Sequence, residues 1–326
     1  MKRSPTATAL AALLALTTAC TTEPSASDPV GTALPERTEI TVGLLPIVDV
    51  APVHLAIARG LFEAEGLSVT TEIVQGGAAA IPALVGGDLD IAYGAWPSFL
   101  IANQEGIALR AIADGVAASP GFTEFLALPG SNLEGDPAGM AGATIAVNTL
   151  GNIGELAVRS TLEAAGVDPD DVQLIEIPFP DMGAALERGD VDVIWASEPV
   201  PTIVKSGLDA VVVTDSFVGD LAGFPVAGYQ ATAEFTDENP NTVAAFQRAL
   251  AAAAELSRDD PSLVVQLVPE YTGLAADLAG EIALPVYGGA IDASILQRVN
   301  DYLVTFGMLA DGLDIAALVF QEPRGG

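Results

Sequence analysis

The feature that most constrains the fold of this chain is an internal repeat. Residues 83–93, ALVGGDLDIAY, align without gaps on residues 185–195, ALERGDVDVIW, at a constant offset of 102 residues. Solenoid units repeat every 20–50 residues or so, so an offset of this size corresponds to a whole lobe. Each copy has the pattern of a helix end, a glycine stop and a short strand that finishes on an aromatic residue. The repeat therefore predicts two lobes of similar construction.

Around the repeat, the apolar pattern alternates short strands with helices. This alternation predicts an α/β fold in which each lobe is a mainly parallel sheet flanked by helices. After Tyr229 the pattern changes to long helical segments with no strand between them. We expect strands at 40–45, 68–74, 90–93, 109–113, 143–147, 172–177, 191–195 and 210–213, and helices at 51–59, 78–85, 153–165, 181–187, 242–258, 262–268 and 293–306.

The start of the chain predicts export. Lys2 and Arg3 precede an apolar run at 7–16, and small residues follow it. A charged start, a short apolar stretch and a small-residue cleavage site together describe a secretory signal, here residues 1–19. Beyond this start no window of about 18 apolar residues occurs, so no later segment is expected to span a bilayer.

Cys20 is the only cysteine in the chain, so no internal disulfide is expected. The segment around it resembles a bacterial lipoprotein signal, although Thr17 stands where such signals usually carry leucine. The resemblance implies that Cys20 becomes the acylated N-terminus and anchors the protein on the outer face of the bacterial cell membrane. Residues 20–38, rich in Thr, Ser, Pro and Ala, would form a flexible tether.

The charge balance argues against a nucleic-acid partner. The full chain has a formal charge of −31, and without Lys2 and Arg3 its 12 basic residues become 10 against 43 acidic ones, a charge of −33. A surface this negative repels phosphate backbones. We therefore expect no nucleic-acid partner. We also expect a small-molecule ligand and a monomeric protein.

Candidate binding residues lie where strands end. Ligands of open parallel sheets bind outside the carboxyl ends of the strands, which places Tyr93 and Trp195 at the mouths of the two lobes. Either ring could instead belong to the core. Trp96 aligns with Glu198 in the repeat. A carboxylate at Glu198 would oppose an anion and could bind an amine, a ring N–H or a cation, or it could accept hydrogen bonds from a helix start.

Helix starts that face the predicted cleft are the second group of candidates. Their unpaired N–H groups and partial positive charge bind anions without a basic side chain, although the same residues could serve as ordinary caps. His54, the only histidine, lies near the same rim, where it could contact a ligand or be a solvated or satisfied side chain. The candidates at helix starts and tight turns are Val48, Asp49, Gly76, Gly77, Asn148, Thr149, Gly151 and Asn152.

Three motifs give the chain a family resemblance. They are AIARGLFEAEGLSV at 56–69, GDLDIA at 87–92 and WASEP at 195–199. In this order and spacing they resemble the substrate-binding proteins of bacterial ABC importers, in the branch for sulfonates, taurine, nitrate and thiamine-type pyrimidines. The resemblance covers nearly all of 40–309.

The resemblance implies a two-lobed type II periplasmic binding protein fold. One lobe would combine 39–125 with 229–326, and the other, 126–228, would be inserted. Two crossover strands near Thr123–Leu128 and Pro225–Ala231 would join the lobes and act as the hinge. Lobe closure about a few hinge residues is a known way to bury a ligand.

The resemblance also implies a function. The chain would capture a small organic solute, either sulfonate- or taurine-like or pyrimidine- and thiamine-precursor-like, and deliver it to a permease with an ATPase subunit. No Lys or Arg falls in the predicted cleft loops, which weakens the case for a small hard anion such as nitrate.

Two other functions are compatible with such a fold: an enzyme such as a pyrimidine synthase, and a sensor that has no transporter. The enzyme needs a reactive histidine and a lysine, and Lys205, the only lysine after the signal, is far in sequence from His54. One histidine and one acylated cysteine cannot form a catalytic triad or a metal site. We therefore expect a binding protein without cofactor or metal.

Overall fold

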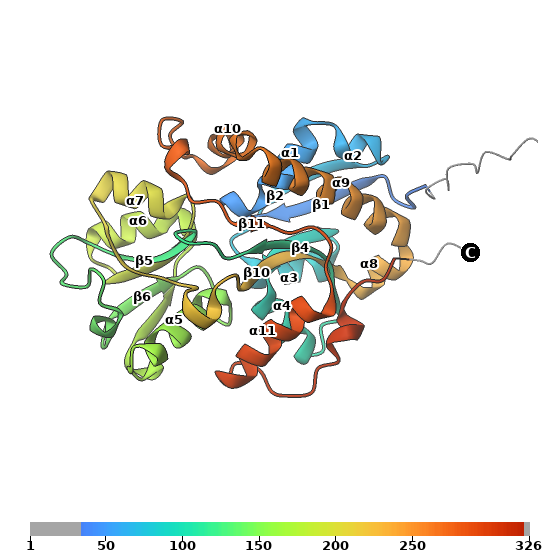
Figure 1. Cartoon of the computed structure of the whole chain (residues 1–326). Coiled ribbons are helices and arrows are strands. Elements are labelled where there is room, and N and C mark those ends of the chain that lie inside the picture. The colour runs from blue at the N-terminus through green and yellow to red at the C-terminus, as the bar shows by residue number, and fades with distance from the viewer. Residues whose placement is uncertain (1–33, 323–326) are drawn as a thin grey trace, which may run out of the picture. The chain divides into compact units, whose positions relative to one another are not determined.

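Two β-sheets organise the part of the chain that the computed structural model describes, residues 34–322 (Figure 1). The expected signal at 1–19, the acylated Cys20 and most of the expected tether at 20–38 lie outside the described residues. Among the helices within 34–322, none is long and apolar enough to cross a membrane.

The first sheet, within the described residues, has six strands in the order β11-β4-β10-β3-β1-β2. Helices α1, α2, α9 and α10 lie together, whereas α3, α4 and α11 form a second group (Figure 1). The strands are β1 (Glu39–Leu44), β2 (Ser68–Ile73), β3 (Ile91–Ala95), β4 (Leu109–Ala117), β10 (Pro225–Thr232) and β11 (Val286–Tyr287). The helices are α1 (Ala51–Ala58), α2 (Leu61–Ala64), α3 (Gly77–Gly86), α4 (Trp96–Gln104), α8 (Ala233–Glu238), α9 (Pro240–Asp259), α10 (Pro261–Thr272) and α11 (Ala293–Thr305).

The second sheet has five strands in the described part of the chain, in the order β7-β6-β8-β5-β9. Helices α6 and α7 contact each other beside this sheet, and α5 also packs against β8. The strands are β5 (Thr123–Ala127), β6 (Thr144–Val147), β7 (Gln173–Glu176), β8 (Val193–Ser197) and β9 (Val211–Asp215), and the helices are α5 (Ile153–Ala164), α6 (Phe179–Arg188) and α7 (Val200–Leu208).

Both sheets mix parallel and antiparallel neighbours, so the expectation of mainly parallel sheets holds only in part. β1, β2 and β3 are parallel to one another, as are β6, β7 and β8. Strand β10 lies antiparallel to β3, and strand β5 lies antiparallel to β8. Each arrives directly from the other sheet and so lacks the helical crossover that joins consecutive parallel strands.

The sequence repeat is also a structural repeat. Helix α3 and strand β3 match α6 and β8 residue for residue at the offset of 102. Gly87 and Gly189 end the two helices in the left-handed region, at φ of 79° and 73°. Asp90 Oδ2 accepts the N–H of Thr41, and Asp192 Oδ2 accepts the N–H of Thr144, each at 2.8 Å. The two aspartates thus join each repeat to the neighbouring strand of its own sheet.

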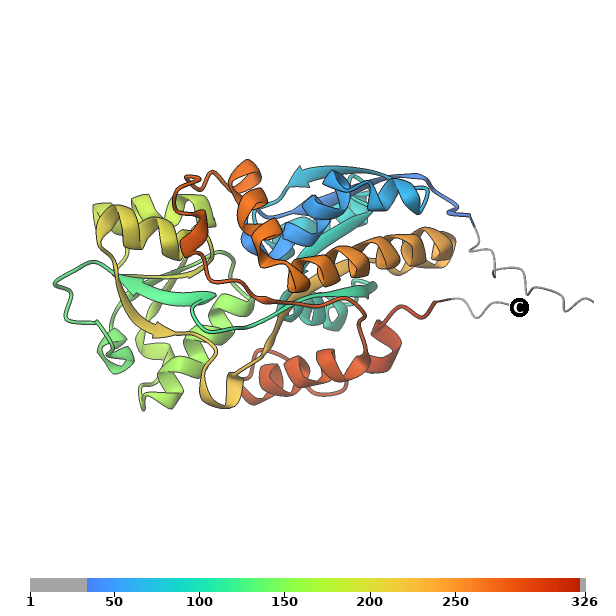
Figure 2. The same ribbon diagram turned by 45° about the horizontal axis from the view of Figure 1, so that its top comes forward.

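The chain passes between the sheets at residues 118–122 and 216–224. The segments expected as crossover strands, Thr123–Leu128 and Pro225–Ala231, lie mainly in strands β5 and β10, which directly follow these two passages. Residues 273–285, between α10 and β11, also reach toward the second sheet (Figure 2). There the hydroxyl of Ser119 donates to the carbonyl oxygen of Leu284 at 2.6 Å.

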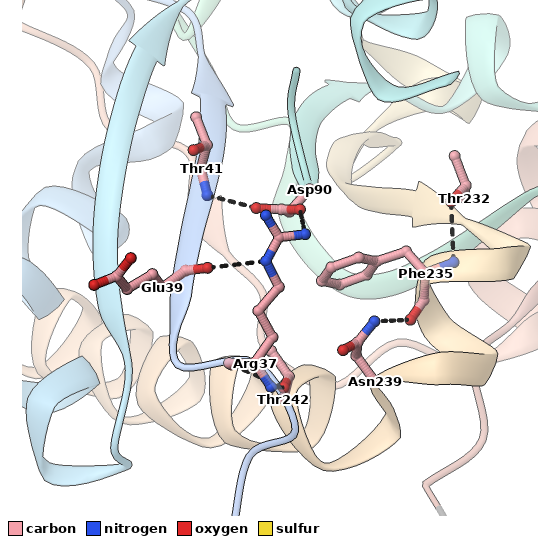
Figure 3. A network of polar contacts seen from close by, with 8 residues as sticks. All are labelled: Arg37, Glu39, Thr41, Asp90, Thr232, Phe235, Asn239 and Thr242. Atoms are coloured by element: carbon pink, nitrogen blue, oxygen red, sulfur yellow. Dashed lines mark hydrogen bonds and ion pairs between the residues drawn. The ribbon is translucent and has the colours of Figure 1, made fainter. Parts of the chain in front are cut away.

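Segments far apart in sequence meet at the starts of β1 and β3 (Figure 3). Arg37 pairs with Asp90 at 2.7 Å, and its backbone N–H donates to Thr242 Oγ1 at 2.9 Å. These contacts fix the beginning of the first sheet against helix α9, so the segment before β1 and the late helix α9 belong to the same half of the fold.

Candidate ligand-binding site

A cavity of about 30 Å³ lies between the two sheets. It is close to the ends of β3 and β8, the edge where ligands of such sheets bind. Its walls come from both sides: Leu45, Ile47, Asp49, Gly77, Tyr93, Ala95, Val226 and Ala227 with the first sheet, and Thr123, Asn148, Asn152, Ile153, Phe179, Trp195 and Ser197 with the second.

A larger hollow of about 700 Å³ includes Arg37, Asp90 and Phe235 among its lining residues. It lies at the opposite end of the first sheet, where β1 and β3 begin, and all its lining residues belong to that half of the fold. The family resemblance predicts a ligand site between two lobes, and of these two cavities the smaller one is lined by residues of both halves. We therefore place the site in the smaller cavity.

Asp49 is the one carboxylate among the described residues that line this cavity. It lies in the short turn Val48–Val50 before α1 and is only 3% exposed. Tyr93 donates its hydroxyl to Oδ2 at 2.7 Å, and Ser197, on the other sheet, donates to Oδ1 at 3.2 Å. Burial raises the pKa of Asp49 to about 6, although these hydrogen bonds partly oppose that rise. Asp49 therefore joins the two halves directly.

Tyr93 and Trp195, the equivalent aromatic residues of the repeat, both line the cavity and are both buried. The indole N–H of Trp195 donates to Ser216 Oγ at 2.8 Å, and its ring lies 6.0 Å from that of Phe179. Tyr93 meets Tyr229 edge to face at 5.2 Å. Both interpretations of these rings, core and cleft, therefore apply. Each ring lines the cavity on one side and packs against buried core residues on the other.

Three polar atoms in the cavity wall are buried without a hydrogen-bond partner among the described residues: Asn148 Oδ1, Asn152 Oδ1 and Thr123 Oγ1. The amide of Asn152 is held by its Nδ2, which donates to Thr149 Oγ1 at 3.1 Å. Buried polar atoms nearly always have partners in folded proteins. Their concentration here is typical of a surface that completes its hydrogen bonds with a ligand or water.

Two helix starts also reach the cavity. Gly77 begins α3, and Ile153 begins α5 after Asn152. Neither helix has a side-chain hydrogen bond at its N-cap. Their first N–H groups can donate to a ligand, as expected for helix starts at a cleft.

Four other candidates from the sequence lie beside the cavity rather than in its wall. Val48 donates its N–H to the carbonyl oxygen of Glu198 at 3.0 Å. Gly76 lies against Thr149 across the two halves, so close that a Cβ on Gly76 would be 2.6 Å from Thr149 Oγ1. Gly151 donates its N–H to Glu155 at 3.0 Å.

Trp96 and His54 lie elsewhere. Trp96 is fully buried and meets Phe99 edge to face at 5.7 Å, over the backbone of Gly228. His54 stacks on Tyr271 at 3.9 Å and lines a separate hollow of about 500 Å³. Burial lowers the pKa of His54 to about 4, so this side chain is neutral at pH 7.

Glu198 is fully buried and lies outside the cavity wall. It accepts hydrogen bonds from Thr202 Oγ1 at 2.9 Å and from the N–H of Ala283 at 3.4 Å. Burial raises the pKa of Glu198 to about 7, and these hydrogen bonds and Lys205 partly oppose the rise. Of its two possible roles, the geometry fits the acceptor at a helix start, since Thr202 is in the first turn of α7.

The repeat contained more of the site than its aligned segment suggested. When the alignment is extended beyond residues 83–93 in both directions, the offset of 102 pairs Gly77 with Phe179 and Ala95 with Ser197. All four residues line the cavity. This register could have identified Phe179 and Ser197, which sequence analysis missed. Thr123 carried no comparable pattern, because it enters the site on an antiparallel strand.

Comparison with known proteins agrees with this architecture. A model of the NMT1-like family matches residues 33–263. The nitrate import ATP-binding protein NrtC of Synechocystis is 24% identical over 294 residues, covering 82% of this chain and 43% of that protein. The nitrate/nitrite binding protein NrtA of Synechococcus elongatus is 27% identical over 287 residues, covering 77% of this chain and 62% of that protein.

The fold is likewise that of a solved binding protein. The alkanesulfonate-binding protein SsuA of Xanthomonas axonopodis, bound to MOPS, superposes with a TM-score of 0.75 at 18% identity, covering 87% of this chain and 99% of that one. These matches confirm the two-lobed α/β fold and the branch of proteins that the sequence motifs indicated.

Proposed function

We propose that this chain, which belongs to the NMT1-like family, is the exported solute-binding component of an ABC importer. It would bind a small organic solute between its two halves and deliver it to a permease with an ATPase subunit. In this proposal Cys20 is acylated and the protein acts as a monomer on the outer face of the cell membrane.

The observation that carries the proposal is the cavity whose wall comes from both sheets, with Asp49 and Ser197 hydrogen-bonded across it. A solute in this position would hold the halves together and be released when they separate. We propose that the lobes are 39–125 with 229–326 and the inserted 126–228. The passages at 118–122 and 216–224 would supply the hinge.

The relatives support binding rather than catalysis. NrtA and SsuA are named as binding proteins, and the chain is accordingly a binding protein and not an enzyme. NrtC is named as an ATP-binding protein for nitrate import. The chain spans only 43% of the length of NrtC and 62% of the length of NrtA, so the partners of those proteins do not transfer to it directly. An ABC permease and an ATPase as partners of this chain are therefore part of the proposal.

Lobe closure tests the proposal. Spin labels would be placed at Ile73→Cys and Leu150→Cys, two exposed positions on opposite halves, in a Cys20→Ser background. Pools of sulfonates, amines and pyrimidines would be added while the distance between the labels is measured by pulsed electron resonance. We expect at least one pool to narrow and shorten the distance distribution. If no pool changes it, and deleting the gene leaves the uptake of every pool unaltered, the receptor function is wrong.

A further inference from the structure

The chemistry of the cavity wall narrows the class of solute, on the premise that the proposed receptor function holds. Asp49 contributes a carboxylate to the wall, and no Lys, Arg or His of the described chain lines the cavity with it. An anion in this cavity would meet a negative charge at short range with no cationic side chain in the wall to offset the repulsion. The side chains therefore disfavour a simple anion.

Two of the three unpaired polar atoms in the wall have the same preference, whereas the third, the Thr123 hydroxyl, can donate or accept. Asn148 Oδ1 and Asn152 Oδ1 are carbonyl oxygens, which can only accept hydrogen bonds. In the arrangement seen here, Asn152 uses its Nδ2 on Thr149, so its carbonyl oxygen is the atom left for a ligand. A ligand that carries only acceptors would leave both oxygens unpaired, and each unpaired buried acceptor costs binding free energy.

The helix starts at Gly77 and Ile153 are the feature that would favour an anion. Asp49 shares their cavity, so a negative charge is already present beside these positive helix ends. Their N–H groups can still bond to a neutral acceptor atom on one side of a ligand that presents donors on its other side.

The aromatic walls add a requirement of shape. Tyr93, Phe179 and Trp195 place three rings around a narrow space. Flat π-systems stack favourably on such rings. Combining these walls with the acceptors, we infer that the solute is a compact, planar compound that presents N–H groups to Asp49, Asn148 and Asn152. An amidine, a urea or an amino-substituted ring has this chemistry.

Probes of equal shape and opposite hydrogen bonding test the inference. Guanidinium, urea and nitrate are all trigonal planar. The first two donate hydrogen bonds from their N–H groups, whereas nitrate only accepts hydrogen bonds. Binding of each, and of 4-aminopyrimidine and methanesulfonate, would be measured by calorimetry on the full chain at millimolar ligand. We expect at least one donor probe to bind and both acceptor anions to fail.

Two matched variants assign the effect to the cavity. Asp49→Asn keeps the shape of the side chain and removes its charge, whereas Asp311→Asn makes the same change at an exposed position. Loss of a charged hydrogen bond should weaken donor binding at least about tenfold in Asp49→Asn and leave Asp311→Asn unchanged.

The outcomes separate this inference from the receptor function. If nitrate or methanesulfonate binds the unaltered chain and Asp49→Asn binds it as well or better, the donor inference is wrong and the receptor function stands. If no probe of either kind binds, the donor inference is also overturned. The lobe-closure measurement then decides the receptor function separately.

Discussion

Asp49 and Ser197 belong to different sheets and are joined by a hydrogen bond of 3.2 Å, from the serine hydroxyl to Oδ1 of the carboxylate. Ser197 is the last residue of β8, and its repeat equivalent at the end of β3 is Ala95, which has no hydroxyl. The two copies of the repeat therefore differ at the last residue of their strands. Only the second copy of the repeat carries a hydroxyl that can bond to Asp49.

Removing this bond should loosen the closed arrangement. Ser197→Ala would delete the donor to Asp49 and favour separation of the halves by about 1 kcal/mol, or roughly fivefold in the population ratio. The distance between labels at Ile73 and Leu150 measures that ratio. Ser206→Ala, an exposed change on α7, should have no effect, and an equal shift in both variants would contradict the prediction.

Gly76 is the position where a single methyl group should hold the halves apart. Its backbone is extended, at φ of 174°, so alanine is allowed there, but the new Cβ would meet Thr149 Oγ1 at 2.6 Å. We expect Gly76→Ala to weaken solute binding without lowering the melting temperature. Gly86→Ala, whose nearest contact would be 3.8 Å away, is the control at the last residue of α3, the helix that Gly76 precedes. Unchanged solute binding in Gly76→Ala would contradict the prediction, because it would mean that the halves close around the added methyl group.

Glu198 should make stability depend on pH. Because burial raises its folded-state pKa to about 7 from 4.5, the folded chain holds this proton more tightly than the unfolded chain does. Stability should therefore fall as the pH rises from about 4.5 to 7, by an amount of order 3 kcal/mol for this group. Urea unfolding of the chain and of Glu198→Gln measures the difference. The prediction fails if the free energy of unfolding depends on pH in the same way for the unaltered chain and for Glu198→Gln across this range.

Gly154 is required by the ring of Trp195. A Cβ on Gly154 would be 2.7 Å from Cε3 of the indole, inside a packed layer between α5 and β8. Gly154→Ala should lower the free energy of unfolding by about 1–3 kcal/mol through overpacking. Gly207→Ala, in α7 with no atom near the new Cβ, should instead be neutral or slightly stabilising. Equal effects of the two substitutions would remove the basis for this assignment.

The lipid anchor has a direct test at Cys20. Acylation there would keep the protein with the membrane fraction, and Cys20→Ser should release it to the soluble fraction. Incorporation of labelled fatty acid, present in the unaltered chain and lost in the variant, reports the same chemistry. Soluble behaviour of the unaltered chain would disprove the anchor.

The sequence by itself determined the architecture, because local periodicity and glycine stops depend on neighbouring residues. The 102-residue offset predicted two lobes, and α3–β3 and α6–β8 follow it residue for residue. It also singled out Tyr93 and Trp195, which do line the cavity, but from the middle of β3 and β8 rather than from their predicted ends, because both strands run two residues further than predicted. These features need no knowledge of what packs across the sheet.

Only the tertiary structure decided which side chains face the cavity. Trp96 follows the same strand as Tyr93, but its ring packs over Gly228 on β10, a strand more than 100 residues away in sequence. Glu198 bonds to Thr202 and Ala283 outside the cavity. Asp49, which the sequence indicated only as part of a helix start, is the carboxylate that lines the cavity. The direction of a side chain near a strand end depends on which distant segments fill the space around it. The sequence repeat contains no information about those segments.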